Sequence, residues 1–360
     1  MTETLNHEHR ASRRAGLAAA LGAAFFFGIS APFSKLLLGS VSPSMLAGLL
    51  YMGSFLGLTL LSLFRRPPSP EGAREAALRG KDFLYLAGSI LAGGIAAPLF
   101  LLYGLAVTEA SVASLLLNIE GVLTVLLAAL IFREHVGKSI LASAAVMLAA
   151  GSILAYAPGP GGWHVRTGSL LVAASALMWA FDNNITRELS HRDPFVIARL
   201  KGLAAGATNL AIAFAAGAAL PRLPSIAGSL ILGALSYGCS LVFFIYALRN
   251  LGTSRTSTCF GAAPFIGVLV SITLFGESLT AQIVTASALM LLGIWLIMRE
   301  YHEHEHTHAR LCHDHAHTHD EHHDHDHDGD PAATHSHTHT HGPLAHSHAH
   351  VPDLHHFHRH

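Results

Sequence analysis

The chain has 360 residues, 51% of them hydrophobic and 12% charged, and its formal net charge is −1. This near-neutral charge does not indicate a nucleic-acid partner, and three cysteines do not form a disulfide framework. No nucleophile–base pair and no phosphate-binding loop motif occurs in the sequence, so we expect neither an enzyme nor a required cofactor. Repeated apolar runs of about 18 residues or more instead predict helices that span a lipid bilayer.

The apolar runs predict ten helices joined by short polar connections. The predicted ranges are 16–38, 43–64, 82–107, 109–132, 139–157, 168–189, 194–219, 226–248, 253–275 and 281–299. Pro43, Pro194 and Gly252 fall at junctions, where helices are expected to begin or end. We therefore expect an all-α polytopic membrane protein.

Lysine and arginine predict the orientation, because cytoplasmic loops carry them in excess. With the N-terminus inside, 17 of the 22 basic residues lie in cytoplasmic segments. Only Lys35, Arg166 and Arg222 lie on the external side, and the remaining two are within helices. Both termini are thus predicted to be cytoplasmic, and the protein is predicted to lie in an inner (plasma) membrane of the bacterial type.

An internal repeat relates the two halves of the chain. Residues 103–134 align without gaps on residues 246–277 at an offset of 143, and this pairs Tyr103 with Tyr246 and Glu134 with Glu277. Each half holds five helices, and an odd number inverts the second half relative to the first. The predicted organisation is an arm (1–14), a first repeat (15–157), a connecting loop (158–167), a second repeat (168–300) and a tail (301–360).

This doubled five-helix unit, with a fourth helix that carries Gly or Pro and ends at a lone glutamate, resembles the EamA-type branch of the drug/metabolite transporter superfamily. The resemblance covers residues 13–300. It implies ten helices, an inverted repeat and secondary transport of small metabolites, often the export of amino acids, and it fixes no substrate. The family often has an arginine after the proline of each half's second helix. Arg199 fits this pattern, whereas Gly48 stands near the equivalent place in the first half.

Glu120 lies about twelve residues from either end of the fourth predicted helix, near the bilayer midplane. An ionisable side chain at this depth costs about 2.5–3.5 kcal/mol and is a functional candidate by default. Three interpretations of Glu120 are open. It takes up a proton, it pairs with a cationic substrate, or it is a packing residue whose carboxylate is hydrogen-bonded to a neighbouring hydroxyl group. Transport is expected to be coupled to protons, with Glu120 as the candidate carrier.

Asp182 and Lys201 are predicted to pair. They lie on consecutive antiparallel helices, nine to ten residues from the turn between them, so their depths match. A structural clamp and a substrate site are both open interpretations of such a pair. Asn183 adds hydrogen-bonding capacity beside Asp182, and Trp179 lies one turn earlier on the same face.

Three further side chains are candidates for a polar path or for tight packing. Ser114 and Asn118 share one face of the fourth helix. Pro264 stands at the position that matches Gly121, where a proline within a helix would free a backbone carbonyl for a ligand.

The last segment of the chain, 302–360, holds 23 of the 28 histidines, mostly as His-x-His. Its few apolar residues predict disorder, and its imidazoles are suitable ligands for Zn, Ni, Co or Cu. The candidate metal ligands are His302, His304, His306, His308, His313, His315, His317, His319, His322, His323, His325, His327, His335, His337, His339 and His341.

Three functions remain open from the sequence. The first is a metabolite transporter, most simply an exporter, whose cytoplasmic tail binds divalent metal. The second is a divalent-metal transporter that is supplied by the tail, although no histidine lies in a predicted helix. The third is a membrane metal sensor that transports nothing. Expected partners are a small-molecule substrate, the bilayer and divalent metal ions, and we also consider a homodimer.

Overall fold

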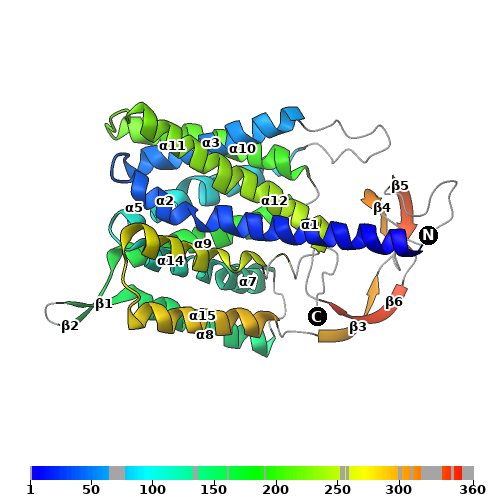
Figure 1. Cartoon of the computed structure of the whole chain (residues 1–360). Helices are drawn as coiled ribbons and strands as arrows, with labels where there is room; N and C mark the ends of the chain where they lie inside the picture. Colours follow the sequence, from blue (N-terminus) through cyan, green and yellow to red (C-terminus); the bar gives the residue numbers. More distant parts are fainter. Residues whose placement is uncertain are drawn as a thin grey trace.

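The computed structural model describes residues 2–64, 78–132, 137–159, 162–189, 192–251, 256, 259–298, 302–308, 311–317, 335–341 and 344–350. The helices form a bundle of roughly aligned rods (Figure 1). A short hairpin lies at one end of the bundle, and the start of the first helix and the strands of the tail lie at the other end (Figure 1). The all-helical fold class of the membrane part is confirmed.

The first half of the chain holds the helices up to the hairpin. They are α1 (Thr2–Gly28), α2 (Ser30–Leu37), α3 (Pro43–Phe64), α4 (Asp82–Ser89), the π-helix η1 (Ile90–Ala96), α5 (Ala97–Ala106), α6 (Ala110–Leu116), α7 (Ile119–Phe132) and α8 (Lys138–Ala155). The antiparallel hairpin β1 (Tyr156–Gly159) and β2 (Gly162–Val165) follows. The hairpin occupies most of the predicted connecting loop.

The second half repeats this order. Its helices are α9 (Thr167–Arg187), α10 (Pro194–Ala215), α11 (Leu223–Gly233), the π-helix η2 (Ala234–Cys239), α12 (Ser240–Leu251), α14 (Ala263–Phe275) and α15 (Ala281–Met298). Among the described residues, seven helices are long and apolar enough to cross a membrane, and α14 and α15 give two shorter apolar helices. The protein is therefore a multi-pass membrane protein, and the number of ten spans stays a prediction.

The two halves share the same irregularities at equivalent positions. η1 and η2 coincide when the sequence offset of 143 is applied, and both occupy the middle of a long apolar segment. The fourth helix of each half is also interrupted at one place, because turns at residues 117–118 and 261–262 precede α7 and α14. The sequence predicted continuous helices at all four places, and the apolar composition across the interruptions explains why.

Close packing between the halves relies on glycines. α3 packs along α10, where a Cβ on Gly202 would lie 3.2 Å from the Tyr51 carbonyl oxygen and one on Gly206 would lie 2.9 Å from the Met52 nitrogen. Glycine allows these backbones to approach each other, as in membrane helix pairs generally. The same face of α10 carries Asn209, which is fully buried.

Regular structure also occurs in the arm and in the tail. The polar arm was predicted to precede the first helix, but α1 extends back to Thr2 because no helix-breaking residue separates the arm from the apolar run. In the tail, residues 302–308 pair with 344–350 (β3 and β6) and residues 311–317 pair with 335–341 (β4 and β5). The alternating His-x-His pattern of these four segments has the period of a strand, and the predicted disorder of the tail stays a prediction.

Candidate functional site

The interruption of the fourth helix places a carboxylate inside the bundle. α6 ends at Leu116, and α7 begins at Ile119, so Glu120 lies in the first turn of α7. Acidic side chains are favoured at such a helix start by the helix dipole. Half-helices that meet inside the membrane are how many secondary transporters expose backbone polar groups to a substrate.

Glu120 is held by α9. The Nδ2 of Asn183 donates to Glu120 Oε1 at 2.9 Å and to Thr124 Oγ1 at 3.2 Å. The next residue, Asn184, donates to the Thr124 carbonyl at 3.0 Å. Glu120 is half-buried and Asn183 is exposed, so this pair can be reached from outside the packed core.

The predicted pairing of Asp182 with Lys201 is present. The ammonium of Lys201 contacts Asp182 Oδ2 in a short ion pair between α9 and α10. The other carboxylate oxygen accepts hydrogen bonds from Ser89 Oγ at 2.5 Å and Thr186 Oγ1 at 3.0 Å. Asp182 is only 6% exposed, so each of its oxygens has a partner where water is scarce.

The π-helix η1 lies directly against this ion pair. A Cβ on Gly93 would be 1.9 Å from Asp182 Oδ2, so no larger residue fits there without displacement. The carbonyl of Gly93 accepts from Tyr51 OH at 2.5 Å and from Trp179 Nε1 at 3.1 Å, and Asn209 donates to the neighbouring Gly94 carbonyl at 2.9 Å. A π-helix releases carbonyls from the regular α-helical ladder, and these side chains use them.

A chain of aromatic rings extends from Tyr51 to the other half of the molecule. Tyr51 and Tyr237 have ring centroids 5.5 Å apart, and Phe27 contacts both Tyr237 (6.5 Å) and Phe260 (5.2 Å). Tyr237 lies in η2. Tyr51 binds the Gly93 carbonyl, which lies against Asp182, and the next residue, Asn183, binds Glu120. The rings and the carboxylate therefore belong to one central region, to which both halves contribute.

The structure also places the three remaining candidates. Asn118 is half-buried at the helix break, with Nδ2 3.6 Å from the sulfur of Met290. Ser114 is buried against α14, where a Cβ on Gly267 would be 2.6 Å from the Ser114 Oγ, which favours the packing interpretation. Pro264 is the second residue of α14, so the prediction of a proline inside a helix is wrong for it. A first-turn proline has no intrahelical hydrogen bond to lose.

Sequence reasoning missed Tyr51, Gly93 and Tyr237. Tyr51 and Tyr237 lie inside apolar runs, where a single tyrosine is unremarkable. The Gly93–Gly94 pair was the available signal, because two glycines within a membrane helix indicate a close approach by a neighbouring group. Glu134, which the repeat pairs with Glu277, lies outside the described residues.

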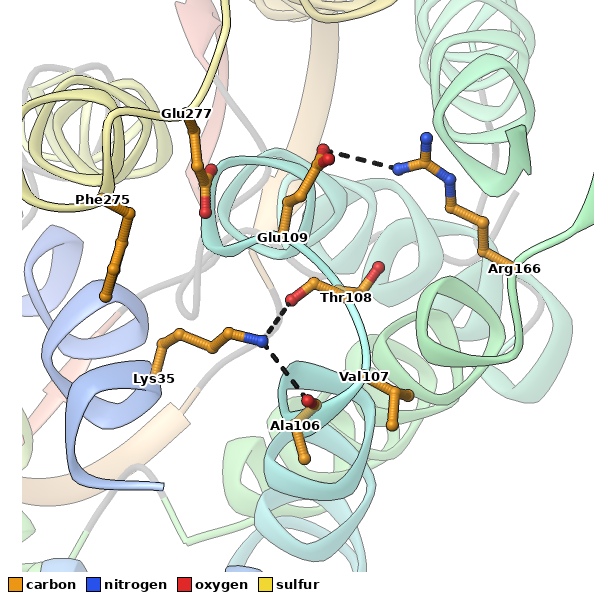
Figure 2. Close-up of a pocket in the computed structure, with 8 residues that line it drawn as sticks. All are labelled: Lys35, Ala106, Val107, Thr108, Glu109, Arg166, Phe275 and Glu277. Atoms are coloured by element: carbon orange, nitrogen blue, oxygen red, sulfur yellow. Dashed lines mark hydrogen bonds and ion pairs between the residues drawn. The ribbon is translucent and has the colours of Figure 1, made fainter. Parts of the chain in front are cut away.

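A second polar cluster lies at the hairpin end of the bundle. Lys35 Nζ donates to the carbonyls of Leu105 (2.7 Å), Ala106 (3.3 Å) and Thr108 (2.8 Å) at the end of α5. Glu277 accepts from the first two backbone N–H groups of α6, and Arg166 lies 3.5 Å from Glu109. Figure 2 shows these side chains around a pocket of about 610 Å³.

No ready-made metal centre is present in the part of the chain that the structure describes. Within these ranges, no three His, Cys, Asp or Glu residues are grouped so that they could hold an ion. The tail strands place histidine positions opposite each other in register: 302 with 350, 304 with 348, 306 with 346, 313 with 339, 315 with 337 and 317 with 335.

Many secondary transporters consist of two repeats of membrane helices, with interrupted helices at the substrate site. The two halves of this chain each have an interrupted fourth helix, and Glu120 lies at one of the interruptions. This arrangement is that of a secondary transporter. The EamA-like transporter family model matches residues 14–156 and 166–299, and the chain belongs to this family. The protein is accordingly a transporter of the drug/metabolite type and not an enzyme.

Relatives with curated descriptions agree with this class. An "Uncharacterized transporter" of Methanothermobacter thermautotrophicus is 29% identical over 78% of this chain and 85% of its own length. A "Probable terminal-alkyne amino-acid exporter" of Streptantibioticus cattleyicolor is 26% identical, over 64% of this chain and 77% of its own length. The "Uncharacterized inner membrane transporter YedA" of Escherichia coli K12 is 27% identical, and the match spans about half of each chain (45% and 54%).

A solved crystal structure shares the fold. Its TM-score is 0.54 at 19% sequence identity, and the match covers 79% of this chain and 97% of that one. At this identity the likeness concerns the arrangement of the helices alone.

Proposed function

We propose that this protein exports a small amine-bearing metabolite, such as an amino acid, by proton-coupled transport, with Glu120 as the residue that exchanges a proton for the substrate's ammonium group. The observation that carries the proposal is the environment of Glu120. Among the described residues, the side chain that donates a hydrogen bond to Glu120 is the uncharged Asn183. Lys201 is already paired with Asp182. A carboxylate inside a membrane helix is costly, and ionisable residues at such depth mark substrate and proton pathways.

The surroundings of Glu120 support this substrate class. The rings of Tyr51, Tyr237 and Phe260 give the region apolar faces, which bind both hydrocarbon side chains and cations. Asn118 and Asn183 add neutral hydrogen-bonding groups at the helix break. The relative from Streptantibioticus cattleyicolor that is named an amino-acid exporter is consistent with an amine-bearing substrate.

The test is transport in proteoliposomes against a panel of amino acids and amines, with the Glu120→Gln variant beside the parent. Glutamine retains the hydrogen bond from Asn183 but cannot release a proton, so we expect normal insertion and at least a tenfold loss of pH-gradient-driven flux. Glu188→Gln is the matched control, because the same chemical change is made at an exposed residue beyond the end of α9. Unchanged gradient-driven flux in Glu120→Gln would remove Glu120 from this role.

We further propose that the two repeats are residues 15–157 and 168–300, that both termini are cytoplasmic in the inner membrane, and that the tail binds divalent metal and regulates transport. The register of the tail strands supports the metal proposal, because histidine positions meet across each ladder. Neutral imidazoles so placed suit Zn, Ni, Co or Cu. Association into a homodimer stays a prediction.

The tail experiment compares the full chain with a version that ends at Tyr301, using Ni, Co, Zn and the amino-acid panel. We expect metabolite flux in both versions and sensitivity to metal only in the full chain. Metal uptake that weakens on truncation would instead establish a metal transporter. A third version exchanges His335 with Ser336, His337 with Thr338 and His339 with Thr340. This keeps the composition but moves these histidines out of register with β4, so unchanged metal binding would show that composition alone matters.

A further inference from the structure

The start of α6 is held by a side chain from the other half of the protein. The backbone N–H groups of Ala110 and Ser111 donate to Glu277 Oε1 and Oε2, each at 2.9 Å. The helix has no cap of its own, since the Glu109 side chain makes no capping bond. Glu277 thus supplies, from 166 residues further along the chain, the acceptors that a helix start requires.

The turn after α14 directs Glu277 toward α6. Gly276 ends α14 with φ of 64°, in the left-handed region that glycine adopts most readily. This turn sends the chain back across the bundle end. Figure 2 shows Glu277 and Lys35 approaching the stretch 106–109 from different segments. The corner therefore joins the end of α5, the start of α6 and the end of α14.

α6 connects this corner to the central region. Its seven residues span about 10 Å, and all seven are buried. The helix break with Asn118 and Glu120 follows directly at its other end. Because α6 is tightly packed against α14 at Ser114 and Gly267, a movement at one of its ends is transmitted to the other as a rigid-body shift.

Three hydroxyl groups along this path are buried without a hydrogen-bond partner among the described residues: those of Thr108, Ser111 and Ser114. Buried hydroxyls without partners destabilise the conformation that buries them. A conformation that admits water along α6 removes this cost. Thr108, Ser111 and Ser114 therefore form a polar path along α6, which is buried, and so closed to water, in this structure.

We propose that Glu277 is a positioning residue of the transport cycle, which holds the hairpin end of the bundle closed by binding the start of α6. Release of the carboxylate frees α6 to move, opens the polar path of Thr108, Ser111 and Ser114 to water, and shifts Glu120 at the far end. Closure at this end and the position of the central carboxylate are thereby coupled through one short helix.

The test measures access and requires no substrate. Cys239, Cys259 and Cys312 are replaced by alanine, Ser111→Cys is introduced, and a membrane-impermeant maleimide is added from either side of oriented vesicles. Glu277→Gln removes the charge and leaves a single acceptor oxygen, so one of the two hydrogen bonds is lost and the other is weakened. We expect the labelling rate from the hairpin face to rise about tenfold, which corresponds to ~1.4 kcal/mol in the closing equilibrium.

Glu109→Gln is the matched control. It changes a carboxylate in the same pocket whose pairing with Arg166 is longer and half-exposed, so labelling should stay at the parent rate. Equal labelling in Glu277→Gln and parent would overturn the proposal, as would an equal rise in Glu109→Gln. If Glu277→Gln does not give a monodisperse protein, Glu277→Asp keeps the charge and shortens the reach, and the same two outcomes decide. Failure here leaves the role of Glu120 in transport standing.

Discussion

Replacing Lys201 tests whether the buried ion pair is a structural clamp. Lys201→Met retains the hydrocarbon stem and removes the ammonium, so Asp182 keeps only the hydrogen bonds from Ser89 and Thr186. The two side chains of the pair are 17% and 8% exposed, so solvent screens the lost interaction weakly. Removal of one partner from a buried pair costs about 3–5 kcal/mol, and the two hydroxyls favour the lower end.

The assay is thermal unfolding in nanodiscs, followed by tryptophan fluorescence. A loss of ~3 kcal/mol corresponds to a fall in Tm of roughly 6–12 °C at 2–4 °C per kcal/mol. Arg222→Met is the control, because Arg222 is exposed and should change Tm little. The double variant Asp182→Asn with Lys201→Met should recover most of the loss, since no charge is left unpaired.

Two outcomes would refute this reasoning. A Tm for Lys201→Met within about 2 °C of the parent would show that the pair contributes little to the folded state. A double variant as unstable as the single one would show that the loss came from packing around the lysine stem and not from the charge left on Asp182.

Two other substitutions, one at Gly93 beside the ion pair and one at Lys35 at the hairpin end, are tested by the same melting assay. Gly93→Ala places a Cβ 1.9 Å from Asp182 Oδ2 and should destabilise the protein by about 1–3 kcal/mol, whereas Gly121→Ala, with nothing within 4 Å, should be close to neutral. Equal effects of these two changes would contradict the close approach of η1 to α9. Lys35→Met removes the cation that binds the last carbonyls of α5 and should cost about 1–2 kcal/mol. The exposed Lys138→Met is its control, and a Lys35 variant as stable as that control would argue against capping of α5.

The membrane class and the ion pair could be predicted because each depends on simple geometry. Apolar runs of sufficient length identify spans, and matched depth on antiparallel helices brought Asp182 and Lys201 together. The contact of Glu120 with Asn183 was not predicted, although both residues were candidates. Sequence spacing gives the depth of a residue, but it does not show which helices are neighbours.

The helix break at 117–118 could not be foreseen for a different reason. The stretch from Leu115 to Val122 holds one glycine, after the break, and no proline, so local propensity favours continuous helix. Packing of the two fourth helices, α6 against α14, accompanies the interruption. Tertiary contacts of this kind outweigh local preference, and they become visible only when both halves are seen together.

The paired π-helices have an evolutionary consequence. η1 and η2 differ in sequence, ILAGGIA against ALSYGC, yet they occupy equivalent places in the two halves. An irregularity that is shared in place but not in sequence is most simply inherited from one ancestor. A duplicated ancestral unit that already held the π-helix would account for both copies. In the first half the released Gly93 carbonyl accepts from Tyr51 and Trp179, whereas in the second half the π-helix itself carries Tyr237, so the same distortion serves a different purpose in each half.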